Sequence, residues 1–350
     1  MKKHYTYFET LIVGLAVFSL LFCIAQKTEA VVGIPDQVPA ATLLAPFFEV
    51  GVSSGEDTLL VITNQGHTDS TLHCEIWDRD GNILASQNIA IDDHTEWHIS
   101  MKTWLDALEI THPGIKANLQ VGDYYWGYIT FDSVTAPTLK HPDEAGYPFA
   151  TNNDFTGWIY FVDLLEGKSN GLSMVPIEAV SSAVSSAAQT GFYDDTNDTS
   201  REEIDGPARK YAETLTRGDS YTTPSFIEMF GRFYQNEVND GKTRMVIWRY
   251  WPQIHGALSI NCDNAYIKSE TGTTKMVTIP LDHVVNVIEL DGFADPTDYP
   301  AGWIYLLQQK TNPAGNPTTH EIYGFTINSA NSDQASLNWM AIFEMQILVH

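Results

Sequence analysis

The amino-acid sequence predicts an all-β protein: two immunoglobulin-like antiparallel β-sandwiches joined by a long linker with one short helix. Short runs of β-branched and aromatic residues alternate with clusters of Gly, Asn, Asp and Pro along most of the chain. Helical periodicity is scarce. Several segments of the first half also resemble segments of the second half at near-constant spacing, which predicts that one sandwich plan occurs twice.

Composition and charge narrow the choice of partners. The 350 residues are 18% charged and 43% hydrophobic, which is enough apolar material for one large core or two ordinary ones. The 44 acidic residues outnumber the 19 basic ones, and the formal net charge is −25. Repulsion at long range then argues against binding to nucleic acid or to an anionic membrane surface.

Residues 1–30 have the pattern of a secretory signal peptide. Two lysines follow Met1, an apolar stretch runs from Leu11 to Ala25, and a small residue, Ala30, precedes the expected cleavage point. The apolar stretch is shorter than the ~20 residues that a membrane-spanning helix needs. The mature chain is therefore expected to be secreted, into the periplasm or outside the cell, without a membrane anchor.

The first sandwich is expected over residues 31–180. In Leu72–Trp77 the even positions are apolar, so Cys74 should point into the core. The Asp80-Gly81 pair that follows favours a tight hairpin turn. The expected strands are Thr42–Val50, Thr58–Asn64, Ser70–Trp77, Ile83–Ile91, Glu96–Ser100, Tyr124–Asp132 and Trp158–Asp163.

Residues 181–223 form the expected linker, and the composition of Pro207–Arg217 predicts its short helix. Six carboxylates lie between Tyr193 and Asp205. Oxygen ligands at this density could hold calcium outside the cell, with Asp194, Asp195 and Asp198 as the candidate ligands. A solvated acidic loop is the alternative, because the glycine of a helix-loop-helix calcium site is missing. No other cofactor is expected.

The second sandwich is expected over residues 224–350. Thr58–Ile62 resembles Thr243–Ile247 at a spacing of 185, and Cys74 matches Cys262 at 188. Each cysteine is expected in the core of its own sandwich, too far from the other for a disulfide. A Gly-Trp-Ile-Tyr sequence at 157–160 recurs at 302–305, but at a different spacing of 145, which leaves the strand correspondence open. The expected strands are Phe226–Tyr234, Arg244–Tyr250, Ala257–Cys262, Lys275–Ile279, Val284–Leu290, Trp303–Gln308, Glu321–Thr326 and Leu337–Leu348.

Two aromatic clusters supply the candidate binding residues. They lie at 124–128 and 248–252, and only alternate members of a strand can be buried. The outward members could stack on sugars or dock a partner. The candidates are Trp251, which precedes a proline at a strand end, and Tyr250, Tyr124 and Trp126.

The segment Val38–Val50 resembles the opening of a family of secreted bacterial proteins of unknown activity. Other matching segments follow in the same order over nearly the whole mature chain: Thr58–Asn64, Ile177–Ala179, Arg201-Glu202, Phe230–Tyr234, Met245–Arg249 and Gly302–Tyr305. The resemblance implies export and a β-sandwich plan. It supplies no catalytic or binding residue.

Three functions follow from these observations. The leading hypothesis is a secreted, non-enzymatic structural or adhesive protein of the cell surface, since no nucleophile turn and no phosphate-binding glycine loop is present. The alternative is a carbohydrate-binding module that uses exposed aromatic residues. The third is a glycoside hydrolase with paired carboxylates. The expected partners are an extracellular glycan or further copies of the chain.

Overall fold

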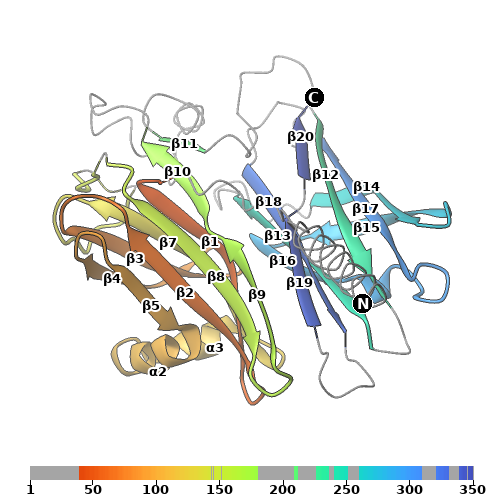
Figure 1. The fold of residues 1–350 in the computed structure, drawn as a ribbon, viewed down its shortest axis with the longest axis horizontal. Helices are drawn as coiled ribbons and strands as arrows, with labels where there is room; N and C mark the ends of the chain where they lie inside the picture. Colours follow the sequence, from red (N-terminus) through yellow and green to blue (C-terminus); the bar gives the residue numbers. More distant parts are fainter. Residues whose placement is uncertain are drawn as a thin grey trace, which may run out of the picture. The chain divides into compact units, whose positions relative to one another are not determined.

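The computed structural model describes residues 39–142, 144, 146–150, 152–179, 209–211, 226–235, 240–250, 260–309, 321–330, 339–344 and 346–349. The predicted all-β class is confirmed, because this part of the chain folds into four antiparallel sheets (Figure 1). Residues 38–350 form one compact unit. The predicted signal peptide and most of the predicted linker lie outside the described residues, and the division into two domains stays a prediction.

Two sheets of the first half enclose a core. Gly157 in one sheet lies directly against the Leu43 side chain of the other. The larger sheet follows the order β11 (Arg209–Tyr211), β10 (Val175–Ala179), β1 (Thr42–Gly51), β7 (Tyr124–Val134), β3 (Ser70–Asp78) and β4 (Ile83–Ile91), with β6 (Gln120–Val121) beside β7; the smaller follows β5 (Glu96–Ser100), β2 (Glu56–Asn64), β8 (Phe155–Asp163) and β9 (Lys168–Ser173).

The second half repeats this arrangement. A 3-10 turn, η3 (Leu290–Gly292), follows strand β16 (Val285–Glu289) in this half. One sheet follows the order β20 (Gln346–Val349), β12 (Phe226–Tyr234), β17 (Ala301–Gln309), β14 (Ile260–Ser269) and β15 (Thr274–Leu281); the other follows β16 (Val285–Glu289), β13 (Lys242–Tyr250), β18 (Glu321–Ala330) and β19 (Trp339–Glu344).

The strand orders confirm that one plan occurs twice. The order β10-β1-β7-β3-β4 matches β20-β12-β17-β14-β15, and β5-β2-β8-β9 matches β16-β13-β18-β19. A hydrogen-bond motif recurs at the same place. The Thr58 hydroxyl donates to the carbonyl of Glu49 and accepts from its amide, and the Thr243 hydroxyl makes the same two bonds with Tyr234. Thr58 and Thr243 therefore correspond, at the spacing of 185 that the sequence predicted.

A pair of glycines extends this correspondence to β7 and β17. A Cβ on Gly127 would lie 2.3 Å from the carbonyl oxygen of Trp77, and one on Gly302 would lie 2.0 Å from that of Lys268. Gly302 therefore corresponds to Gly127. The two Gly-Trp-Ile-Tyr sequences lie on non-equivalent strands, β8 and β17, which explains their different spacing.

The hairpin turns that follow Trp77 and Lys268 match as well. Gly81 and Gly272 adopt positive φ angles of 86° and 94° at the same place in each turn.

The predicted match of Cys74 with Cys262 is wrong, however. Cys74 pairs with Phe131 and Ala265 pairs with Leu306 in equivalent strands, so Ala265 is the counterpart of Cys74. An irregularity between Cys262 and Ala265 in the pairing of β14 accounts for the displacement. Cys74 is a buried free cysteine, whereas the Cys262 side chain lies outside the described residues, so the expected separation of the two thiols stays a prediction.

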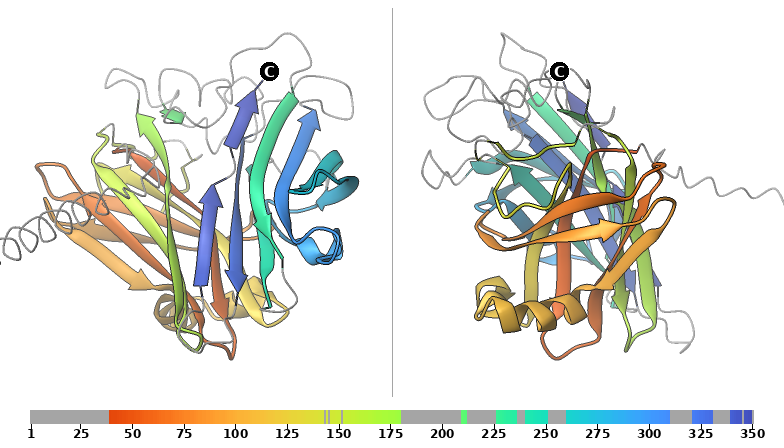
Figure 2. Two further views of the ribbon diagram at one scale, coloured as in Figure 1. Left: turned by 45° about the vertical axis from the view of Figure 1, so that its right-hand side comes forward. Right: turned by 90° about the vertical axis from the view of Figure 1, so that its left-hand side faces the viewer.

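The helical predictions need correction. Residues 209–211, inside the segment predicted as a short helix, form strand β11 on the edge of β10, because backbone pairing outweighs helix propensity there. Two helices that the sequence analysis missed, α2 (Met101–Thr111) and α3 (Ile115–Leu119), lie at one end of the first pair of sheets (Figure 2). The spacing of the buried residues Met101, Trp104, Leu105 and Leu108 is helical.

The larger of the two main apolar clusters takes members from both halves of the chain. The rings of Tyr128 and Trp248 meet edge to face at 6.0 Å, and those of Phe47 and Phe325 lie 6.5 Å apart. The smaller cluster lies inside the second half, between β12, β14, β15 and β17 on one side and β13 and β16 on the other. Strand β13 therefore contributes to both clusters, with alternate residues on its two faces.

Candidate functional site

A polar cleft of about 370 Å³ lies where β1, β2 and β7 approach β13 and β16. Seven carboxylate side chains and three cationic ones line it, together with one tyrosine ring. The lining residues are Glu49, Glu56, Asp57, Tyr124, Phe161, Val162, Asp163, Lys168, Asp240, Lys242, Arg244, Glu289, Asp291, Ser329 and Met340.

A buried ion pair joins the two halves at this cleft. The Arg244 guanidinium donates to Oε1 of Glu49 at 2.8 Å and to Oε2 at 2.5 Å, and the indole N–H of Trp126 donates to Oε2 at 2.9 Å. Burial alone would lower the pKa of Arg244, but the charge and hydrogen bonds of Glu49 outweigh burial and raise it. Both oxygens of Glu49 are therefore engaged.

Three further carboxylates have partners within the fold. Asp57 accepts hydrogen bonds from the Ser100 hydroxyl and the Lys102 amide, so it holds the start of helix α2. Asp163 accepts from two amides of the turn that follows β8. Asp240 is paired with Lys242 at 3.0 Å. Each of these carboxylates therefore has at least one partner within the protein.

Glu56, Glu289, Asp291 and Tyr124 remain as groups that a ligand could meet. The Oε2 atom of Glu56 is buried without a hydrogen-bond partner among the described residues. Desolvation raises the pKa of Glu289, helped by Asp291 and Glu49 and opposed by Arg244. Desolvation and the charges of Glu56 and Glu49 likewise raise the pKa of Tyr124, which keeps its hydroxyl protonated as a donor.

The structure places two of the four predicted aromatic residues at this site. Tyr124 lines the cleft, and Trp126 lies behind it, its ring stacked on Tyr124 at 6.0 Å. The Tyr250 side chain and Trp251 lie outside the described residues. The same holds for Asp194, Asp195 and Asp198, so the calcium hypothesis stays a prediction. In the part of the chain that the structure describes, no group of three or more potential ligand side chains could hold a metal ion.

Glu49 and Arg244 were missed by the sequence analysis. Each interrupts a strongly apolar strand, at Phe47–Val50 and Thr243–Trp248, and both strands are buried. A charged residue in such a run is costly unless it is paired. The sequence therefore indicated that Glu49 and Arg244 each need a partner of opposite charge, but it did not indicate that they pair with each other.

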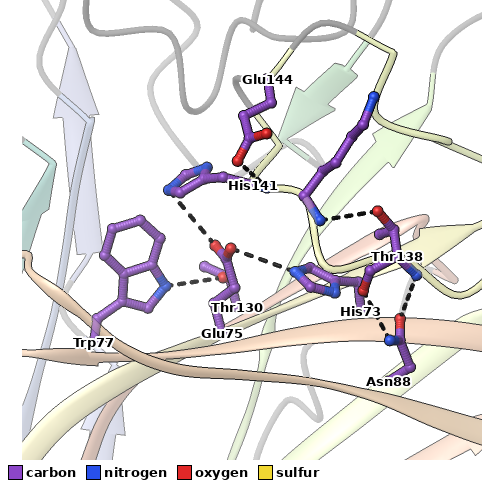
Figure 3. A network of polar contacts seen from close by, with 9 residues as sticks. His73, Glu75, Trp77, Asn88, Thr130, Thr138, His141 and Glu144 are labelled. Carbon is purple, nitrogen blue, oxygen red and sulfur yellow. Dashed lines mark hydrogen bonds and ion pairs between the residues drawn. The ribbon is translucent and has the colours of Figure 1, made fainter.

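A second polar cluster lies between β3 and the segment that follows β7, which includes Thr138 and His141 (Figure 3). The carboxylate of Glu75 lies between two imidazole rings, 3.4 Å from Nε2 of His73 and 3.9 Å from Nε2 of His141. Asn88 exchanges two hydrogen bonds with the backbone of Thr138, which fastens the segment to β4. Since His73 and Glu75 are almost completely buried, we assign this cluster to stability rather than to ligand binding.

Comparison with known proteins adds no assignment. No protein-family model matches the sequence, and no curated protein matches it significantly. The crystal structure of Thermotoga maritima 1070 is similar to this chain at 10% sequence identity and a TM-score of 0.25. The similar region covers 39% of this chain and 94% of the Thermotoga maritima chain. Streptomyces avermitilis α-L-rhamnosidase, solved with L-rhamnose, is similar over 89% of this chain and 26% of its own, at 10% identity and a TM-score of 0.22. At such TM-scores neither likeness supports an argument about function.

One further observation concerns membranes. Among the residues that the structure describes, no helix is long and apolar enough to span a bilayer.

Proposed function

We propose that the protein is a secreted, non-enzymatic adhesive protein that binds an extracellular carbohydrate in the cleft beside Tyr124. The observation that carries this proposal is the combination, in one cleft, of a tyrosine ring with carboxylates that are not consumed by the fold. The signal-like segment at residues 1–30 supports export.

The lining suits a polyhydroxylated ligand. Sugar hydroxyls are good donors to carboxylates, and an apolar sugar face packs on an aromatic ring. Glu56 offers an unpartnered oxygen, Glu289 a second carboxyl group, and Tyr124 the ring and a hydroxyl. A volume of about 370 Å³ is within the range of small-molecule sites.

The engagement of Glu49 argues against a hydrolase that uses Glu49 as one of its two carboxyl groups. A retaining or inverting glycosidase needs two carboxyl groups, one of them free to act as nucleophile or base. Glu289, with its raised pKa, has the character of a general acid. Its neighbour Glu49 is held by Arg244 and Trp126, so Glu49 is not free to act as the second carboxyl group.

A glycan array probed with the mature chain, followed by calorimetry on the glycans that bind, tests this function. We expect Tyr124→Ala and Glu56→Gln each to weaken binding by about tenfold or more, since each removes a ring or a desolvated acceptor. Glu270→Gln, a change at an exposed carboxylate, is the matched control and should bind as the unchanged chain does.

Two results would overturn the proposal. One is the absence of any saturable glycan binding. The other is release of free sugar from a bound glycan that Glu289→Gln abolishes, which would instead support the hydrolase.

A further inference from the structure

The internal repeat allows each surface of one half to be compared with its counterpart in the other half. Within the chain, the outer surface of β1 and β7 packs against the outer surface of β13 and β18. Tyr128 meets Trp248 there, and Phe47 meets Phe325. We call this the inter-half contact. Each of its two surfaces has a counterpart elsewhere in the molecule.

The counterpart of the β1 and β7 surface lies on β12, β14 and β17. Because Gly127 corresponds to Gly302, Tyr128 corresponds to Trp303, which is 42% exposed. The strand register likewise places exposed cations at two positions that hold aromatic residues in the first half: Arg232 is the counterpart of Phe47, and Lys268 is the counterpart of Trp77. We call this surface the β17 face; its outward residues are Phe230, Arg232, Tyr266, Lys268, Met276, Trp303 and Tyr305.

The β17 face is both aromatic and cationic. The Arg232 guanidinium lies 4.5 Å from the centre of the Trp303 ring. The rings of Phe230 and Tyr305 stack at 6.3 Å, and Met276 is 63% exposed. An exposed apolar surface of this kind is typical of a protein interface.

The counterpart of the β13 and β18 surface lies on β2, β5 and β8. Since Thr58 corresponds to Thr243, the register of the paired strands makes Trp158 the counterpart of Phe325, and Thr63 the counterpart of Trp248. Trp158 stacks on Tyr160 at 6.2 Å, and Tyr160 is 37% exposed. We call this surface the β8 face; its outward residues are Leu59, Val61, Thr63, Glu96, His98, Trp158 and Tyr160.

We propose that the mature protein associates head to tail with further copies of itself, the β17 face of one copy packing on the β8 face of the next as the two halves pack within one chain. Superposing the inter-half contact brings Arg232 to the Trp158 ring, in place of Phe47 on Phe325. Guanidinium on indole is a favourable pair.

The backbone contact between the halves has a counterpart as well. Within the chain, the amide of Val285 donates to the carbonyl of Arg79, in the turn after Trp77. Glu96 is the counterpart of Val285, and Glu270 is the counterpart of Arg79, since each lies two residues before the matching glycine of its turn. The repeated contact therefore brings the turn that follows Lys268 of one copy toward the amide of Glu96 on the edge strand β5 of the next.

The two faces differ, so the association is heterologous and each copy leaves one face of each kind available. It extends into an open chain unless the rotation between copies closes a ring. This inference does not depend on the cleft, because neither face includes Tyr124, Glu49 or Arg244.

Sedimentation velocity on the mature chain, residues 31–350, tests the association. We expect species larger than the monomer to appear as the concentration rises from about 1 to about 200 μM, the range typical of modest interfaces. Trp303→Glu and Trp158→Glu should each stop growth of the chain. Ile110→Glu, at an 81% exposed site on helix α2, is the control and should associate normally. Circular dichroism and thermal melting verify that each variant is folded.

Mixing the two interface variants distinguishes a heterologous contact from a symmetric one. Each variant keeps one intact face, so an equimolar mixture should form a dimer and nothing larger. A wild-type chain that is monomeric throughout, a mixture that stays monomeric, or association that survives both tryptophan changes would overturn the proposal.

Discussion

At the scale of single residues, the pair of Glu49 and Arg244 shows how the fold tolerates charge inside an apolar contact. Glu49 is 4% exposed, and the side chain of Arg244 is 19% exposed. Such a pair contributes little net stability over an apolar replacement, but removing one partner leaves the other buried and uncompensated. Its role is therefore to align the two halves at the cleft.

Arg244→Met should accordingly be severe. It leaves the Glu49 carboxylate with the Trp126 indole as its remaining donor, and we expect the free energy of unfolding to fall by about 3 to 5 kcal/mol. Urea titration measures the change. The double variant Glu49→Leu with Arg244→Met should recover most of the loss, because no charge is then left unpaired. A double variant as unstable as the single one would contradict this account.

The cluster of Figure 3 makes stability depend on pH. Burial raises the pKa of Glu75 above its ordinary 4.5, although His73 and His141 oppose this. Burial lowers the pKa of His73, but the hydrogen bond and charge of Glu75 and the charge of Asp132 outweigh it and raise the pKa above 6.5. Both shifts mean that the folded state holds protons more tightly than the unfolded chain.

The sign of the resulting pH dependence follows directly. The contribution of His73 is complete below its ordinary pKa and is lost as the pH rises through the raised value, and ionisation of the buried Glu75 acts in the same direction. We expect the free energy of unfolding to fall as the pH rises from near 4.5 to above 6.5. Urea titrations across this range should show a flatter profile for Glu75→Gln, whereas the exposed control Glu270→Gln should keep the slope. A profile that rises with pH in the wild type but not in Glu75→Gln would refute the assignment.

At the scale of elements, the sequence predicted most strands because alternation and turn residues are local signals. Phe226–Tyr234 was predicted with the bounds that β12 has, and the Asp80-Gly81 turn joins β3 to β4 as expected. Leu337–Leu348 was predicted as one strand, but the chain there divides into β19 and β20, which join different sheets. Local alternation cannot show a change of sheet, since both strands present the same pattern.

The equivalent glycines of β7 and β17 give a test of the repeat. A Cβ at Gly127 or Gly302 would overlap a backbone carbonyl, and backbone cannot move aside as a flexible side chain can. We expect Gly127→Ala and Gly302→Ala each to lower the free energy of unfolding by about 1 to 3 kcal/mol or more. Gly292→Ala is the control, because no atom lies within 4 Å of its Cβ position. Equal stability of all three variants would mean that this close approach is absent.

At the scale of the whole molecule, the cleft could not be found from the sequence. Its lining extends from Glu49 to Met340, and no spacing along the chain indicates which of the many carboxylates meet in space. The aromatic cluster at 124–128 is the part of the sequence analysis that leads to this cleft, because alternation requires some of its members to face outward. Tyr124 lines the cleft, whereas Trp126 donates a hydrogen bond to Glu49 behind it.

The shared apolar cluster leads to a last prediction, about how independent the two halves are. Trp248 and Phe325 belong to the same cluster as Phe47 and Tyr128, so separating the halves would expose large aromatic side chains on both. We expect residues 31–218 and 219–350, produced together as separate chains, to purify as a one-to-one complex. Either chain produced alone should aggregate or bind a hydrophobic dye, because its uncovered surface is the kind that soluble monomers avoid. Gel filtration with light scattering measures the stoichiometry. Two soluble, cooperatively folding monomers that ignore each other would instead favour the two independent domains expected from the sequence, and the contact between Tyr128 and Trp248 would then contribute little to stability.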